Sequence, residues 1–167
     1  MKSHCLLIFF CTVFISILSL SAGEWLLFQT TPANRNQWGS EYFPLGNGAL
    51  GAMLSGGIEE DVLQLNLDSL WSGDMNLERG ARSMGRYQSL GELRILLEKA
   101  PRQPDFYRRE LDLARALHTV VIKAGGTSQI RTAYISAPDQ VLVYSIFSSQ
   151  PLTGRIVLED SRQGMVY

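Results

Sequence analysis

Four neighbouring residues have side chains suited to binding a sugar: Asn66, Asp68, Trp71 and Ser72. An aromatic ring can stack on the apolar face of a sugar, while amide, carboxylate and hydroxyl groups form hydrogen bonds with its hydroxyls. The same pattern has a structural explanation, in which Trp71 closes one end of a fold or packs on a neighbouring domain. We favour the structural explanation and keep sugar binding as the functional hypothesis for these four residues.

The sequence predicts no catalytic residues, although carboxylates are plentiful between positions 59 and 112. None of them lies in a recognisable acid–base motif. The run Glu59–Asp61 follows a predicted hairpin turn, where charged residues usually face solvent, and Glu110 and Asp112 are expected to pair on the surface with Arg108. His118 is the only histidine after position 4, and both cysteines lie before position 12, so we expect no metal site and no cofactor.

The stretch 43–73 sets the pattern that would position these side chains. Glycines at Gly46, Gly48 and the pair Gly56–Gly57 are typical of tight turns between strands. From Leu63 onwards apolar and polar residues alternate, which predicts a strand with one buried face. The strand runs into the short polar loop that carries Trp71.

Further strands follow, with turns between them at regular spacing. The segment 90–98 fits either a strand or a short helix, whereas a loop is expected at 31–36 and at 74–85. Short strands separated by turns predict an all-β protein, an antiparallel β-sandwich, with a sandwich incomplete at its C-terminus as an open alternative. The predicted strands lie at 25–30, 43–45, 62–68, 105–113, 117–123, 127–136, 141–147 and 154–159.

The N-terminus has the pattern of a secretory signal peptide. Lys2 precedes an uncharged apolar run at 6–20, and small residues follow at positions that suit cleavage after Ser21 or Gly23. Because the run is shorter than the ~20 residues of a membrane span, we favour cleavage over an uncleaved anchor. The predicted organisation is therefore a signal peptide at 1–23 and one secreted domain at 24–167, which is not membrane-bound after cleavage.

The charge of the chain argues against one class of partner. Fifteen basic and sixteen acidic residues give a net charge of −1, so nothing favours binding to nucleic acid. The mature domain would contain no cysteine, and its stability would then depend on its hydrophobic core rather than on disulfides.

Two blocks carry a family resemblance: P-L-G-N-G-A-L-G-A-M at 44–53 and Q-L-N-L-D-S-L-W-S-G at 64–73. With their spacing they resemble the N-terminal β-sandwich of glycoside hydrolase family 95, the α-L-fucosidases with some α-L-galactosidase members. Ala49 and Leu67 depart from that family's usual arginine and acidic residue. The block at 87–93 also matches, with Ser89 in place of proline. The insertion that precedes this block in the family is shortened or absent here, through either a true deletion or a mis-spliced gene model. The resemblance favours a strand at 90–98, and Trp38 resembles a tryptophan that packs at the domain edge in that family.

The resemblance implies that the whole protein acts on a fucosylated oligosaccharide or glycoconjugate. In family 95 the loop equivalent to the one holding Trp71 faces the catalytic domain, a barrel of twelve helices, and such a barrel needs roughly 190 residues or more. The present sequence does not contain that stretch, so we expect this chain to be the N-terminal sandwich and to show no hydrolysis alone. The alternatives are a free-standing carbohydrate-binding module and a non-functional truncated product.

Overall fold

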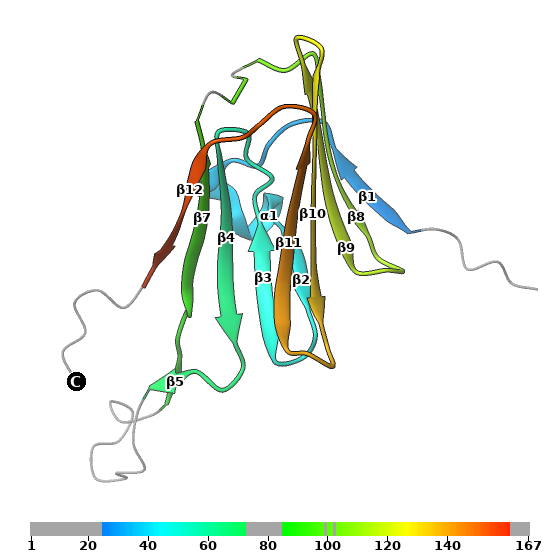
Figure 1. Cartoon of the computed structure of the whole chain (residues 1–167). Coiled ribbons are helices and arrows are strands. Elements are labelled where there is room, and N and C mark those ends of the chain that lie inside the picture. The colour runs from blue at the N-terminus through cyan, green and yellow to red at the C-terminus, as the bar shows by residue number, and fades with distance from the viewer. Residues whose placement is uncertain (1–24, 73–84, 99, 102, 161–167) are drawn as a thin grey trace, which may run out of the picture.

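The computed structural model describes residues 25–160 except 73–84, 99 and 102 (Figure 1). Most of these residues lie in two five-stranded antiparallel sheets. Sheet A has the strand order β1-β8-β9-β10-β11, and sheet B has the order β12-β7-β4-β3-β2. The predicted signal peptide at 1–23 and almost all of the predicted loop at 74–85 lie outside the described residues.

The strands of sheet A are β1 (Leu26–Gln29), β8 (Phe106–Asp112), β9 (Leu117–Ala124), β10 (Thr127–Ser136) and β11 (Val141–Ser148). Those of sheet B are β2 (Phe43–Gly46), β3 (Leu50–Leu54), β4 (Glu60–Leu67), β7 (Gly91–Leu97) and β12 (Gly154–Glu159). A two-stranded ribbon is formed by β5 (Trp71–Ser72) and β6 (Arg86–Tyr87), while a 3-10 turn, η1 (Arg35–Gln37), precedes the helix α1 (Trp38–Glu41). The predicted antiparallel β-sandwich is confirmed.

The turns form where the glycine pattern predicted them. Gly125 and Gly126, with φ of 53° and 78°, join β9 to β10, and Gly56, with φ of 66°, lies in the turn between β3 and β4. Side chains rarely tolerate this region of backbone conformation, so glycine suits these positions. The ambiguous segment 90–98 forms strand β7, because it lies between β4 and β12 and contributes Ile95 to the core.

The segment around α1 was not predicted. The sequence suggested only a loop at 31–36, whereas Arg35–Gln37 forms a 3-10 turn that leads directly into α1. The side chain of Asn34 accepts a hydrogen bond from the backbone N–H of Asn36, which caps the turn. Two short helical turns are too brief to produce an apolar period in the sequence.

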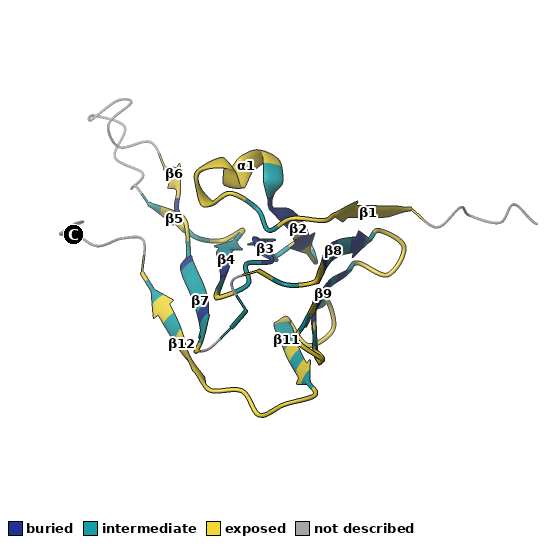
Figure 2. Ribbon diagram, turned by 90° about the horizontal axis from the view of Figure 1, so that it is seen from above, coloured by how far each residue is buried: buried dark blue, intermediate teal, exposed yellow. Residues whose placement is uncertain are grey.

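The apolar core lies between the two sheets (Figure 2). It forms because alternate residues of each strand point inward. One buried cluster joins both sheets and another lies beneath the turn before β4. The first consists of Phe43, Leu45, Ala52, Leu54, Leu63, Ile95, Leu111 and Ala133, and the second of Tyr107, Val120 and Ile122.

A buried polar cluster accompanies the core and corrects one prediction. Asp61, expected to face solvent, is fully buried between the sheets with 0% exposure. Its carboxylate accepts hydrogen bonds from the hydroxyls of Ser55 at 2.9 Å and Tyr144 at 2.5 Å. The guanidinium of Arg131 lies 3.5 Å from it and donates to two carbonyl oxygens of the β3–β4 turn at 2.5 and 2.7 Å. The alternation of β4 turns Asp61 inward, and these partners satisfy its charge there.

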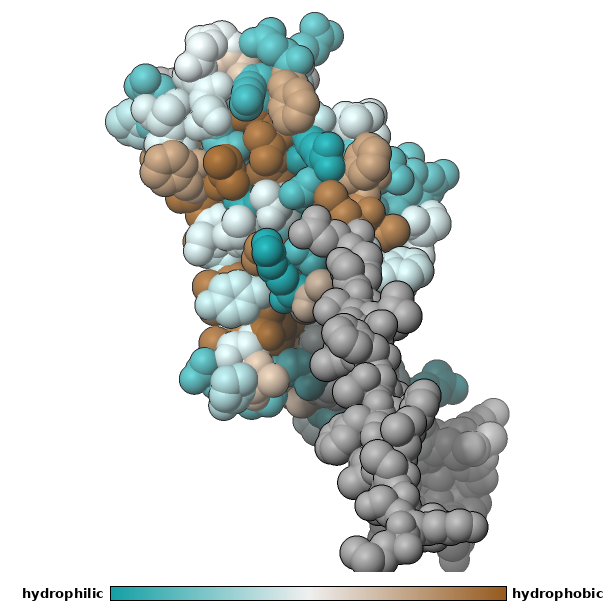
Figure 3. Space-filling model, turned by 90° about the vertical axis from the view of Figure 1, so that its right-hand side faces the viewer, coloured by the Kyte–Doolittle hydropathy of each residue, from teal (hydrophilic) through white to brown (hydrophobic). Residues whose placement is uncertain are grey.

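Several large apolar side chains are exposed at the edges and on the outer surface of the sandwich. The sheets diverge towards their β11 and β12 edges (Figure 2), so that Ile156 of β12 is 72% exposed. On the side of the molecule seen in Figure 3, apolar side chains form patches separated by hydrophilic ones. Phe147, on the outward face of β11, is a further exposed aromatic residue. Among the described residues, no helix is long and apolar enough to cross a bilayer.

Candidate functional site

Strand β4 places two amides on the outer face of sheet B. Because side chains alternate along a strand, Gln64 and Asn66 point outward while Leu63 points into the core. Asn66 lies opposite Gly51 of β3. A Cβ atom at Gly51 would lie 3.7 Å from the Cβ of Asn66. The missing side chain at Gly51 therefore leaves the surface beside Asn66 open.

The β5–β6 ribbon holds a pair of aromatic rings at the end of this sheet. Trp71 lies opposite Tyr87, and the two rings meet edge to face with centroids 5.4 Å apart and an interplanar angle of 68°. The indole N–H of Trp71 donates to the backbone carbonyl oxygen of Asp68 at 2.8 Å. This hydrogen bond and the neighbouring ring fix the orientation of Trp71, although 62% of the residue is exposed.

Ser72 holds the ribbon together. Its hydroxyl accepts a hydrogen bond from the amide Nε2 of Gln88 at 2.8 Å and donates to the carbonyl oxygen of Arg86 at 3.4 Å. The backbone N–H of Gln88 donates to the carbonyl oxygen of Leu70 at 2.9 Å. Ser72 thus connects β5 to the chain that follows β6, which gives it a structural role.

Three adjoining hollows run along the outer face of sheet B, with volumes of about 490, 210 and 210 Å³. The first and second share Trp38, Gln64 and Ser89, and the second and third share Asn66 and Tyr87. We call this surface the sheet-B trough. Figure 2 shows α1 and the β5–β6 ribbon on the same side of sheet B. They contribute Trp38 and Tyr87 to the lining of the trough. The remaining lining residues are Gly46, Gly48, Ala49, Leu50, Gly51, Met53, Leu65, Asp68, Glu92, Glu159 and Asp160.

Acidic side chains give the trough its charge, and ion pairs hold some of them in place. Glu92 accepts hydrogen bonds from Arg35 at 3.0 Å and from Gln64 at 3.3 Å, and Glu159 accepts one from Arg94 at 2.6 Å. None of the lining residues named above is a lysine or an arginine. The trough therefore offers carboxylates and amides to a ligand rather than free cations.

Asn66 differs from its neighbours because part of its side chain is buried without a partner. Its Oδ1 atom is shielded from solvent and accepts no hydrogen bond from the residues that the structure describes. A buried acceptor without a partner costs free energy, typically about 1–3 kcal/mol. A ligand hydroxyl could recover that cost if the side chain turned so that this oxygen faced the trough.

The structure brings together only part of the predicted site. Asn66 and Asp68 line the sheet-B trough, whereas Trp71 and Ser72 are not among its described lining residues and instead support the ribbon that carries Tyr87. Trp38, Gln64 and Tyr87 were missed as site residues. Side chains alternate along a strand, so Gln64 lies on the same face as Asn66 and could have been predicted from the sequence. Tyr87, in contrast, reaches the trough only because β6 pairs with β5.

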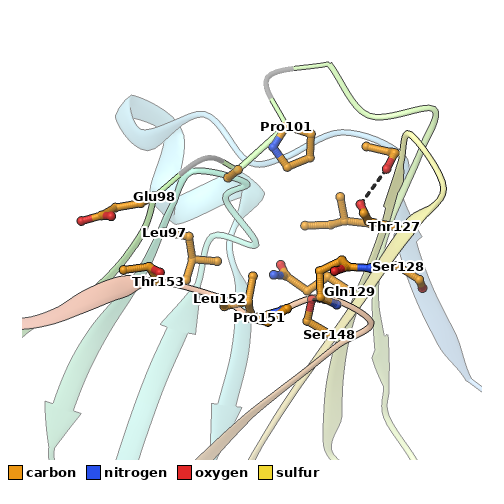
Figure 4. Close-up of a pocket in the computed structure, with 14 residues that line it drawn as sticks. Leu97, Glu98, Pro101, Thr127, Ser128, Gln129, Ser148, Pro151, Leu152 and Thr153 are labelled. Atoms are coloured by element: carbon orange, nitrogen blue, oxygen red, sulfur yellow. Dashed lines mark hydrogen bonds between the residues drawn. The ribbon is translucent and has the colours of Figure 1, made fainter.

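A separate hollow of about 220 Å³ lies between the sheets near the β11–β12 connection (Figure 4). It is lined by aliphatic and small polar side chains such as Leu97, Ser128 and Leu152, without an aromatic ring. Among the residues that the structure describes, no group of three histidine, cysteine, aspartate or glutamate side chains could hold a metal ion. The sheet-B trough is thus the surface with the chemistry closest to the predicted sugar site.

Comparison with known proteins identifies the family. The glycosyl hydrolase family 65 N-terminal domain matches this chain at residues 27–83 and 75–163. The chain therefore belongs to this family of glycosyl hydrolase N-terminal domains. The prediction of an N-terminal glycoside hydrolase domain is confirmed.

Curated relatives agree with the α-fucosidase resemblance. "Probable alpha-fucosidase A" of Aspergillus niger is 31% identical over 161 residues, which covers 75% of this chain and 20% of that protein. "Alpha-L-fucosidase 2" of Arabidopsis thaliana is 27% identical over 144 residues, which covers 67% of this chain and 17% of that protein. The chain thus spans about a fifth of the length of these relatives.

Proposed function

We propose that this chain forms the N-terminal β-sandwich of a secreted α-L-fucosidase that acts on fucosylated glycans. In this proposal the sandwich supports a catalytic helical barrel that is not contained in the present sequence. The observation that carries the proposal is the similarity to two named α-fucosidases over two thirds to three quarters of the chain. The apolar run at 6–20 supports secretion.

An assay of the protein purified from the culture medium of its natural source tests this proposal. We expect an intact mass far above the 18.6 kDa of this sequence, and turnover of 4-nitrophenyl α-L-fucoside and of a fucosylated oligosaccharide. The N-terminal residue of the secreted protein should follow Ser21 or Gly23. A protein of high mass without fucosidase activity would overturn the proposed reaction.

The second candidate function is a free-standing carbohydrate-binding module without hydrolytic activity. The observation that favours it is the sheet-B trough, which has aromatic rings, amides and an acceptor without a partner. A secreted mass equal to residues 22–167 or 24–167, together with sugar binding and no turnover, would support this candidate against the first.

A further inference from the structure

We propose that the sheet-B trough is a binding subsite for a neutral oligosaccharide, formed by Trp38, Gln64, Asn66 and Tyr87. This subsite differs from the predicted set because Trp38 and Tyr87, rather than Trp71, supply the rings. Only the choice of a fucosylated ligand rests on the proposed function. The proposal itself rests on the trough.

The aromatic residues of the trough are placed as a sugar site requires. Trp38 is 50% exposed and Tyr87 is 44% exposed, and both line the same hollow. Trp38 comes from α1 and Tyr87 from β6, two elements on the same side of sheet B (Figure 2). Edge-to-face contact with Trp71 holds the Tyr87 ring in place before a ligand arrives. Such preorganisation lowers the entropy cost of binding.

The floor of the trough supplies hydrogen-bonding groups of both kinds. Asn66 lines the trough, and its Oδ1 atom is buried without a partner among the described residues. In the proposed complex the side chain turns so that this oxygen accepts a hydrogen bond from a sugar hydroxyl. Gln64 is held by its hydrogen bond to Glu92, and the open surface at Gly51 lets a ligand approach Asn66 closely. A site with buried polar groups that a ligand must satisfy discriminates strongly for hydroxyl-bearing ligands.

The charge of the lining selects a neutral ligand. Asp68, Glu92, Glu159 and Asp160 line the trough. The arginines beside them, Arg35 and Arg94, are held in ion pairs with Glu92 and Glu159. A sulfated or carboxylated glycan would bring like charges together, which is unfavourable. A neutral oligosaccharide can instead donate hydroxyl hydrogens to these carboxylates.

Isothermal titration of the purified chain with 2′-fucosyllactose tests the proposal. We expect Trp38→Ala and Tyr87→Ala each to weaken binding at least about fivefold, because each removes one aromatic contact. Trp38→Phe should keep the affinity within about threefold of the unmodified chain. Phe147→Ala is the matched control, since Phe147 is an exposed aromatic residue on sheet A, and it should leave binding unchanged. The melting temperature of each variant shows whether it remains folded.

Several outcomes would overturn the subsite. These are no binding by the unmodified chain, equal binding by folded Trp38→Ala, or equal weakening by Phe147→Ala. Replacing the ligand with a sulfated form should weaken binding at least about threefold, and this difference should shrink at high salt. Tighter binding of the sulfated form would contradict the argument from charge.

The subsite and the proposed reaction can fail independently. A native protein without fucosidase activity, whose chain still binds 2′-fucosyllactose in a Trp38-dependent way, would overturn the reaction and support the subsite. A native protein that hydrolyses fucosides, with binding by the chain unaffected in Trp38→Ala, would support the reaction and overturn the subsite. The sandwich would in that case contact the catalytic domain through this face.

Discussion

Strand β4 carries two polar residues with opposite environments, Asp61 on its inner face and Asn66 on its outer face. Asp61 is fully buried, and its carboxylate has hydroxyl partners and a guanidinium nearby. Asn66 lies at the floor of an open trough, and its Oδ1 atom has no hydrogen-bond partner among the described residues. Both positions are polar in sequence, yet the hydrogen bonds of one are completed within the fold and those of the other are not.

The difference lies in whether the protein itself completes the hydrogen bonds. Around Asp61 the two sheets bring partners from β10 and β11, which are distant in sequence, so the buried charge is compensated. Burial in this cluster also raises the pKa of Tyr144, so its phenol stays protonated and donates to Asp61. Among the described residues, α1 and the β5–β6 ribbon lie on the outer side of sheet B and supply no such partner for the Oδ1 atom of Asn66. The completed hydrogen bonds around Asp61 stabilise the fold, whereas the unsatisfied oxygen of Asn66 could be satisfied by a ligand.

Asp61→Ala should cause the largest loss of stability. Removal of the carboxylate leaves the buried guanidinium of Arg131 without its charged neighbour and the Tyr144 hydroxyl without an acceptor. Loss of one member of a buried ion pair typically costs about 3–5 kcal/mol. Urea unfolding followed by circular dichroism would measure this change in the free energy of unfolding.

An exposed ion pair provides the control for Asp61→Ala. Glu110 accepts a hydrogen bond from Arg108 at 2.8 Å on the outer face of sheet A, where both side chains are partly exposed. Glu110→Gln should therefore change stability by less than about 1 kcal/mol. Similar losses in the two variants would contradict the view that burial gives the Asp61 cluster its importance.

Lowering the pH should destabilise the fold through His118, another residue of the sandwich interior. His118 is 1% exposed, and its Nε2 atom has no hydrogen-bond partner among the described residues. Burial lowers the pKa of its imidazole from 6.5 to about 4. The unfolded chain thus binds a proton more readily than the folded one. The contribution of His118 to the free energy of unfolding is therefore fully present above pH 6.5. It is lost as the pH falls towards 4, which lowers the free energy of unfolding by up to about 3 kcal/mol.

A comparison of pH profiles isolates this effect from that of the carboxylates. The free energy of unfolding of the unmodified chain and of His118→Leu would be measured between pH 7 and pH 4. We expect the variant to be less stable at pH 7, because the leucine also loses the contact with Phe43, but to lose less stability on acidification. Parallel profiles would show that His118 does not contribute to the pH dependence.

Much of the fold could be predicted because its signals are local. Glycine pairs marked the turns around β3 and between β9 and β10, and alternating residues marked strands such as β10, whose predicted bounds at 127–136 match. The choice between strand and helix at 90–98 could not be made from period alone. It depended on the neighbouring strands β4 and β12.

The candidate site was harder to predict because its residues meet only in three dimensions. Asn66 and Asp68 were proposed because their side chains can form hydrogen bonds with a sugar. Trp38 reaches the trough from α1, a helix too short to produce a repeating pattern of apolar residues in the sequence. The burial of Asp61 was also missed, since its neighbours Glu59 and Glu60 are acidic and its partners lie 70 and 83 positions away. Such long-range pairing leaves no trace in a local charge pattern.

Trp71→Ala should have a modest effect, because it removes a support of the trough rather than part of its lining. The edge-to-face contact with Tyr87 is worth about 0.5–1.5 kcal/mol, and 62% of Trp71 is already exposed. We expect stability to fall by about 1 kcal/mol or less, and binding of 2′-fucosyllactose to weaken about threefold. Trp71→Phe should restore part of the binding but lacks the hydrogen bond to Asp68. Weaker binding in Trp71→Ala than in Tyr87→Ala would place Trp71 in direct contact with the sugar.

Asn66→Ala should have the smallest effect on stability, although it lies on the same strand as Asp61 and is replaced by the same residue. The substitution removes an oxygen that is buried without a partner, so the folded state loses no hydrogen bond through that atom. We expect the free energy of unfolding to change by less than about 0.5 kcal/mol, while binding of 2′-fucosyllactose falls at least about fivefold. A loss of stability near that of Asp61→Ala would mean that Asn66 belongs to the structural network after all. Unchanged stability combined with lost binding would separate the outer face of β4, which is open to a ligand, from the inner face, which maintains the fold.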